Sequence, residues 1–240
     1  MKRFCALLLC AVLLCMALPW QTRAAEMDVN AKSALLMDAA TGTVLFEKNA
    51  HEALAPASVT KIMTMLLIME AIDSGSIGYD DMVTASESAA AKGGSQVYLK
   101  AGEQMAVSEM LKSIAVSSAN DCACAMAEHL SGSEGAFVDR MNRRAAELGA
   151  AGTHFSNPNG LPDDTHVTTA YDLARIARAA MGNEAFRRIV STRSAQIPWA
   201  GRTYSRQLRN KNRLLETYPG ATGVKTGFTS RAGRCLVFGA

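Results

Sequence analysis

The segment from Ser58 to Ser74 is apolar nearly all the way round, and this constrains the fold more than any other feature of the sequence. Its length and residue choice predict a helix, which Gly75 would close. A surface helix carries one polar face, whereas apolar residues such as Ile62 and Leu66 occur here on every face. We therefore expect a buried helix, covered on all sides by other elements.

Short β-like segments are expected near both ends of the chain, with helices between them. The predicted strands span residues 34–38 and 43–48, which form a hairpin, and residues 194–198, 203–208, 223–226 and 235–239. The further predicted helices span residues 107–117, 120–130, 134–148 and 169–181. This order predicts a mixed α/β fold in which one antiparallel sheet, built from both termini, packs against a helical lobe. A length of 240 residues suits one domain, or two closely packed lobes.

The first 24 residues have the pattern of a cleaved secretory signal. Lys2 and Arg3 precede an apolar run over residues 4–18, and Thr22-Arg23-Ala24 ends the segment with a cleavage-site pattern. The run is shorter than the about 20 residues of a membrane span. We expect an exported protein whose folded domain is residues 25–240, with no membrane anchor after cleavage. The alternative is an uncleaved N-terminal anchor.

Charge is distributed unevenly along the chain. Residues 186–240 hold 11 Lys and Arg against Glu216 alone. Such a basic region can attract an anionic substrate or a cell-surface polymer, or it can be a solvated face balanced by the acidic remainder. Nucleic acid is not expected as a partner outside the cytoplasm.

The cysteines predict neither a disulfide framework nor a metal site. Three of the six lie in the signal segment, and Cys122 and Cys124 are two apart in a predicted helix, where they point in different directions. We expect these two and Cys235 to behave as small buried hydrophobes. No cofactor is expected.

Ser58 and Lys61 stand three apart, so a helix would place them on one face. A lysine can remove the proton of a serine hydroxyl only when its surroundings favour the neutral amine, and an apolar helix provides such surroundings. Taken alone, such a pair is common by chance and indicates, more often than catalysis, a helix-capping serine beside a lysine that extends to solvent.

Two further motifs favour the catalytic interpretation. Ser118-Ala119-Asn120 lies between two predicted helices, and Lys225-Thr226-Gly227 lies on a predicted strand. With the Ser58/Lys61 pair they resemble the motif set of the serine penicillin-recognising enzymes. Within this group, the closest resemblance is to the low-molecular-mass penicillin-binding proteins that act as D-alanyl-D-alanine carboxypeptidases. It lies in the sequences of residues 56–64, 118–121, 155–162 and 223–229.

The resemblance implies a β-lactamase/transpeptidase-like fold and a role for each motif residue. Ser58 would attack the carbonyl between two terminal D-alanines of a peptidoglycan pentapeptide stem, and Lys61 would accept its proton. Ser118 would relay a proton to the leaving D-alanine, and Asn120 would hold the lysine and the substrate amide.

The third motif would bind the substrate. Lys225 and Thr226 would hold the terminal carboxylate, and Gly227 would let the peptide lie against the strand. The backbone N–H groups of Ser58 and Phe228 would form the oxyanion hole, while the Phe228 side chain is expected only to pack. The resemblance also implies covalent inhibition by β-lactam antibiotics. None of the four histidines is assigned a catalytic role.

Two other functions are compatible with these motifs. A class A β-lactamase would need an additional glutamate, yet no glutamate occurs between Glu147 and Glu184, and Ala119 stands where those enzymes have aspartate. A catalytically silent penicillin-binding sensor is the second alternative, and the intact motifs argue against it. In the family the fold continues past this C-terminus with a strand and a helix, so we expect residues 25–240 to be C-terminally truncated.

Overall fold

The computed structural model describes residues 27–240. The proposed signal segment lies outside the described residues. The chain divides into two units, Met1–Ala31 and Lys32–Ala240, and all helices and strands named below belong to the second. Within residues 27–240 no helix is both long enough and apolar enough to cross a bilayer.

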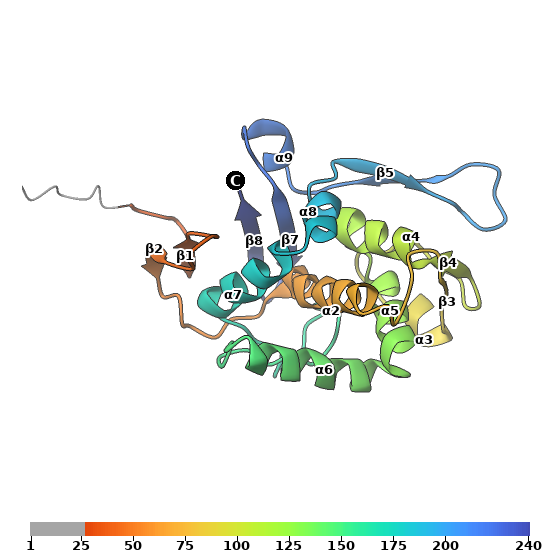
Figure 1. Ribbon diagram of the computed structural model, residues 1–240, viewed down its shortest axis with the longest axis horizontal. Helices are drawn as coiled ribbons and strands as arrows, with labels where there is room; N and C mark the ends of the chain where they lie inside the picture. Colours follow the sequence, from red (N-terminus) through yellow and green to blue (C-terminus); the bar gives the residue numbers. More distant parts are fainter. Residues whose placement is uncertain (1–26) are drawn as a thin grey trace, which may run out of the picture. The chain divides into compact units, whose positions relative to one another are not determined.

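Helices dominate the middle of the chain, as the sequence predicts (Figure 1). The four longest are α2 (Lys61–Asp73), α5 (Asn120–Ser131), α6 (Glu134–Glu147) and α7 (Ala170–Met181). The shorter helical segments are η1 (Ala57–Thr60), α3 (Glu87–Ala90), α4 (Val107–Lys112), η2 (Ser113–Ser117), α8 (Glu184–Val190) and α9 (Leu214–Thr217). Side-chain caps begin several of them: Ser133 accepts the Ala136 N–H of α6, and Thr169 accepts the Asp172 N–H of α7.

The expected buried helix is confirmed. In α2 every residue from Lys61 to Met69 is buried, and the helix contacts α5, α6, α7 and α8 (Figure 1). Ile62, Met65 and Ile68 have no exposed surface. Such packing excludes water from the start of the helix, where Lys61 lies.

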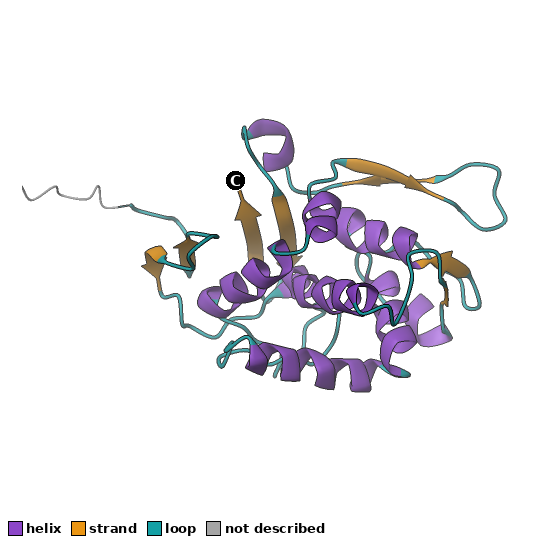
Figure 2. Ribbon diagram, in the orientation of Figure 1, coloured by secondary structure: helices purple, strands orange, loops and turns teal. Residues whose placement is uncertain are grey.

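Strands form four antiparallel pairs among the described residues (Figure 2). The pairs are β1 (Ala34–Met37) with β2 (Val44–Lys48), β3 (Met82–Thr84) with β4 (Gln104–Ala106), β5 (Ser194–Ile197) with β6 (Arg206–Arg209), and β7 (Gly223–Thr229) with β8 (Gly233–Gly239). The mixed α/β class is confirmed. The fold therefore consists of a helical core and four separate two-stranded β-ribbons.

The expected single sheet from both termini takes a different form. No ladder joins β1–β2 to β7–β8 among the described residues; instead α7 contacts both β1 and β8. Arg178 of α7 donates to the carbonyls of Ala39 and Ala40, at 2.8 and 2.9 Å, and so holds the first hairpin to the helix. Alternating hydrophobicity predicts where a strand lies but not which edge it pairs with, which explains the difference.

The buried cysteines behave as expected. Cys122 and Cys124 of α5 have no exposed surface, and Cys235 on β8 is half-buried. Burial raises the pKa of the Cys124 thiol to about 12, so it stays protonated.

Candidate active site

Ser58 lies in the short helical turn η1, directly before α2. Lys61 is the first residue of α2, and its Nζ lies 3.1 Å from Ser58 Oγ. Ala57, which precedes Ser58, has a left-handed backbone with φ +49°. Backbone of this kind is strained in a residue other than glycine and often marks a functional site. The three-residue spacing therefore does bring the hydroxyl and the amine together.

Lys61 is buried and fully engaged by polar partners. Its Nζ donates to Asn120 Oδ1 at 2.6 Å and to the Asn159 carbonyl at 2.5 Å. Burial lowers the pKa of Lys61 well below its usual value, and the nearby charge of Lys225 lowers it further. The neutral amine, which can accept the proton of a serine, is thereby favoured more than in an exposed lysine.

Ser118 and Asn120 reach the site because the polypeptide turns sharply between α4 and α5. The helix expected over residues 107–117 is regular only as far as Lys112; residues 113–117 then widen into the π-type turn η2. Ser118 follows with a left-handed backbone, φ +62°, and Asn120 begins α5. A widened turn of this type commonly occurs at functional sites, and no periodicity in the sequence predicts it.

Lys225 projects from β7 towards Ser118. Its Nζ donates to Ser118 Oγ at 3.0 Å and to the Thr226 carbonyl at 3.0 Å. Burial lowers the pKa of Lys225 to about 7, and the charge of Lys211 acts in the same direction. The site thus contains two buried amines, each hydrogen-bonded to one of the two motif serines.

Gly227 allows β7 to pack directly against the turn that carries Ser58. A Cβ atom at this position would lie 3.0 Å from the Ser58 backbone nitrogen and 3.2 Å from the Pro56 carbonyl oxygen. Thr226 is half-buried beside it. The Phe228 side chain is 67% exposed and lines the cavity described below, so it does not lie in the interior.

A cavity with a volume of about 540 Å³ opens over Ser58. Ser58, Asn120 and Gly160 line it beside the two serine–lysine pairs, and it continues to Tyr98, Arg209 and Lys211. Lys211 Nζ donates to Ser95 Oγ at 2.8 Å. A partly basic cavity of this size can hold part of a peptide.

Sequence reasoning did not identify every residue of this site. Lys211 and Tyr98 were not singled out, although the excess of positive charge after residue 186 was a signal for Lys211. Asn159 and Gly160 lie within residues 155–162, which carry part of the resemblance, but the resemblance assigns neither a role. Asn159 supplies a carbonyl to Lys61, a backbone role that side-chain patterns do not reveal.

His166 is linked to the turn around Ser58 through hydrogen bonds. His166 is buried and accepts the Ser156 N–H at Nδ1, which leaves the proton on Nε2. That Nε2 lies 2.7 Å from Thr60 Oγ1, and Thr60 donates in turn to the Ala57 carbonyl. His166 therefore supports the backbone next to Ser58 without touching its hydroxyl. Among residues 27–240 no cluster of His, Cys, Asp and Glu could hold a metal ion.

Comparison with known proteins places these features in context. A family model described as D-alanyl-D-alanine carboxypeptidase matches residues 20–240. The chain is 49% identical over 214 residues to D-alanyl-D-alanine carboxypeptidase DacF of Bacillus subtilis, covering 89% of this chain and 55% of that protein. It is 37% identical to DacD of Escherichia coli, covering 88% and 55%. The chain thus spans about half the length of these curated relatives.

Solved structures of similar proteins superpose on most of this chain. The D-alanyl-D-alanine carboxypeptidase DacD from Francisella tularensis superposes with a TM-score of 0.84 at 32% identity, covering 90% of this chain and 64% of that one. Penicillin binding protein 6B from Escherichia coli superposes with a TM-score of 0.82 at 34% identity, covering 92% and 69%.

Proposed function

The chain belongs to the D-alanyl-D-alanine carboxypeptidase family, and we propose that it is a serine carboxypeptidase that removes the terminal D-alanine from peptidoglycan stem peptides. One observation carries the proposal most directly. Lys61, a buried amine whose pKa is held low, lies within hydrogen-bond distance of the Ser58 hydroxyl, at the edge of a cavity of peptide size.

The first step is acylation of Ser58. Lys61 takes the hydroxyl proton as Ser58 Oγ attacks the carbonyl carbon between the two D-alanines. The backbone N–H groups of Ser58 and Phe228 stabilise the oxyanion, a contribution typically worth about 3 kcal/mol in related sites. The close approach of Gly227 to the Ser58 nitrogen supports this pairing of β7 with η1.

The second motif serves the leaving group. The departing D-alanine needs a proton on its nitrogen; Ser118 Oγ gives up its own and regains the proton that Lys61 took from Ser58, while Lys225, hydrogen-bonded to Ser118, keeps its charge. Lys225 and Thr226 bind the terminal carboxylate, because a cation and a hydroxyl on the same strand match its charge and its lone pairs. Asn120 holds Lys61 and the substrate amide.

Release of the shortened peptide requires a water molecule. The described residues that line the cavity include no aspartate or glutamate. A β-lactamase of class A uses a glutamate for fast hydrolysis, so this lining favours a slow release of β-lactam adducts. We therefore propose that β-lactams acylate Ser58 and remain bound, as inhibitors.

The cellular location of the protein can be inferred from its proposed substrate. Peptidoglycan stems lie outside the cytoplasm, and the first 24 residues have the composition of a secretory signal. We propose that the protein is exported and acts at the cell wall.

The test is intact-mass analysis after incubation with benzylpenicillin, together with an assay of D-alanine release from an acyl-D-Ala-D-Ala peptide. Wild type should form a one-to-one adduct and release D-alanine. Ser58→Ala should lose both, and Lys61→Ala should nearly do so, while Lys112→Ala, which removes a lysine of α4, is the matched control. An adduct on the Ser58→Ala protein would contradict the assignment of the nucleophile. Rapid loss of the wild-type adduct would indicate a β-lactamase.

A further inference from the structure

Tyr98 combines a strained backbone with an exposed ring. Its φ is +60°, in the left-handed region that a bulky residue rarely adopts. Its side chain is 67% exposed and lines the cavity that contains Ser58. Backbone strain persists only where surrounding contacts enforce it, and an exposed ring gains little from burial. The conformation therefore needs an explanation other than packing.

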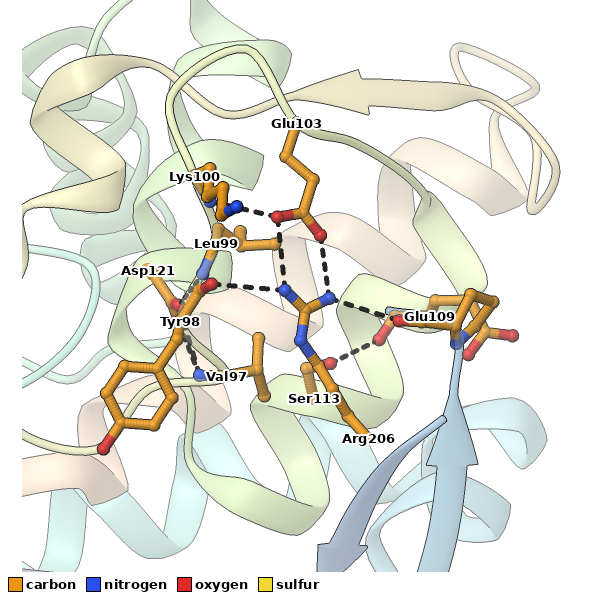
Figure 3. Close-up of polar contacts among 10 residues, drawn as sticks. Val97, Tyr98, Leu99, Lys100, Glu103, Glu109, Ser113, Asp121 and Arg206 are labelled. Carbon is orange, nitrogen blue, oxygen red and sulfur yellow. Dashed lines mark hydrogen bonds and ion pairs between the residues drawn. The ribbon is translucent and has the colours of Figure 1, made fainter. Parts of the chain in front are cut away.

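Three hydrogen bonds to buried charged groups enforce this conformation (Figure 3). The Asp121 carboxylate accepts the N–H of Val97 at 3.1 Å and the N–H of Leu99 at 3.0 Å, on either side of Tyr98. Arg206 Nη2 donates to the Tyr98 carbonyl at 3.2 Å. Asp121 has no exposed surface, and Arg206 has only 5% exposed. Figure 3 shows the Tyr98 ring directed away from the Arg206 guanidinium.

Arg206 is itself fixed by a buried ion pair with Glu103. The two guanidinium nitrogens lie 2.8 and 3.2 Å from the Glu103 carboxylate oxygens, a bidentate arrangement. Glu103 also accepts the Lys100 N–H at 3.0 Å. Arg206 lies on β6, far along the chain, so this pair ties the β5–β6 ribbon to the segment that carries Tyr98. Buried ion pairs contribute little net stability, but they fix geometry.

In the proposed reaction, the cavity near Tyr98 lies on the acyl side of the scissile bond. Lys225 and Thr226 are assigned to the terminal carboxylate, and the cavity lining continues along β7 to Phe228 and Thr229. In a peptide that extends along this strand, the residues before the two D-alanines therefore lie away from Lys225. Tyr98 lines the same cavity, so those residues come within its reach.

We propose that Tyr98 determines specificity for the residue that precedes the two D-alanines, and that Arg206 is the residue that positions it. The ring offers a flat apolar face, which suits a long unbranched aliphatic side chain. This inference rests on the proposed function, since it names the part of the same substrate that the cavity selects.

Two peptides of the form acyl-X-D-Ala-D-Ala test the proposal, with Nε-acetyl-lysine or glycine at X. In the full chain, Tyr98→Ala should lower kcat/KM for the lysine peptide roughly tenfold, through KM, because one aromatic packing contact is lost. The glycine peptide should change less than about twofold, since it has no side chain to pack. Tyr98→Phe should behave as wild type, and Tyr79→Ala, another exposed tyrosine, is the matched control.

Arg206→Lys tests the positioning role. It keeps the positive charge but loses the bidentate pair and the bond to the Tyr98 carbonyl, so it should reproduce the selective loss on the lysine peptide with kcat unchanged. Benzylpenicillin adduct stoichiometry counts the competent molecules in each preparation. Equal losses on both peptides would show a merely structural role for Arg206, and unchanged discrimination in Tyr98→Ala would overturn the proposal. If wild type released D-alanine from neither peptide, the proposed function itself would be wrong.

Discussion

Lys61 and Asn120 are joined by a hydrogen bond of 2.6 Å between Lys61 Nζ and the side-chain oxygen of Asn120. The orientation of this amide is fixed, because its nitrogen donates to the Gly93 carbonyl at 2.6 Å. A neutral oxygen therefore faces the buried amine. It satisfies the hydrogen-bonding need of Lys61 without stabilising its positive charge as a carboxylate would, so the pKa of Lys61 stays low.

Asn120→Asp should therefore slow acylation and change its pH dependence. A carboxylate beside Lys61 favours the protonated amine and raises its pKa, so the acid limb of the acylation profile should move to higher pH. On that limb the rate at a fixed pH should fall about tenfold each time the pKa of Lys61 rises by one. The measurement is the rate of benzylpenicillin adduct formation against pH. Asn120→Ala, which adds no charge, is the control; an unchanged acid limb in Asn120→Asp would exclude Lys61 as the base.

Lys225→Ala should weaken recognition of the substrate carboxylate. Loss of one partner of a buried charge pair typically costs about 2 to 4 kcal/mol, which should appear in kcat/KM for a peptide with a free C-terminus. The same peptide with an amidated C-terminus lacks the carboxylate, so the substitution should lower its kcat/KM little further. Wild-type enzyme that cleaved free and amidated peptides equally well would contradict the assignment.

Binding of the free peptide should also depend on pH through Lys225, because burial lowers its pKa to about 7. In the proposed function the carboxylate binds the charged amine, so above pH 7 binding should be accompanied by proton uptake. KM for the free peptide should consequently rise with pH above about 7, while KM for the amidated peptide should not. Steady-state assays between pH 6 and 9 measure this, and parallel KM profiles would argue against Lys225 as the carboxylate ligand.

How far the site could be predicted from the sequence depended on how each residue reaches it. Ser58 and Lys61 are neighbours by helical geometry alone, and the apolar run after them predicted the burial of the lysine. Ser118, Asn120 and Lys225 come from distant segments, and only the resemblance to a known motif set related them. Without that resemblance, nothing local to Lys225 predicts its hydrogen bond to Ser118.

Other features depend on tertiary contacts that a local pattern does not contain. The left-handed Tyr98 is enforced by Asp121 and Arg206, and neither residue is near it in sequence. The short β3–β4 pair consists of three-residue strands, too short for a recognisable alternation. The separation of β1–β2 from β7–β8 depends on strand edges, which periodicity does not specify.

His166 should make stability depend on pH. Burial lowers its pKa to about 4, against a usual value of 6.5, so the unfolded chain binds more protons between these values. The stabilisation is complete above pH 6.5 and is lost as the pH falls towards 4, with a slope of at most about 1.4 kcal/mol per pH unit. Urea unfolding from pH 4 to 7 measures it. His166→Gln should flatten this slope, and His129→Gln, at an exposed position of α5, is the control; an unchanged slope in His166→Gln would assign the effect to other groups.

Gly160 lies so close to the turn carrying Ser58 that no other residue fits. Its φ is +85°, and a Cβ atom would lie 1.9 Å from the Ala57 carbonyl oxygen and 2.9 Å from the Ser58 nitrogen. Both contacts are to backbone, which can move only if the turn itself moves. Gly75, at φ +72°, has a similar conformation but no atom within 4 Å of the same position.

The two glycines therefore form a matched pair for substitution. Gly75→Ala should lower the free energy of unfolding by about 1 kcal/mol, the cost of left-handed backbone in a residue with a Cβ atom. Gly160→Ala introduces the same backbone strain and, in addition, a clash with η1. The free energy of unfolding should therefore fall further than in Gly75→Ala, and Ser58 should be displaced from Lys61. Urea midpoints and the rate of benzylpenicillin labelling distinguish the two effects. If Gly160→Ala labelled as fast as Gly75→Ala at similar stability, the turn around Ser58 would tolerate movement, and its strained geometry would not be needed for acylation.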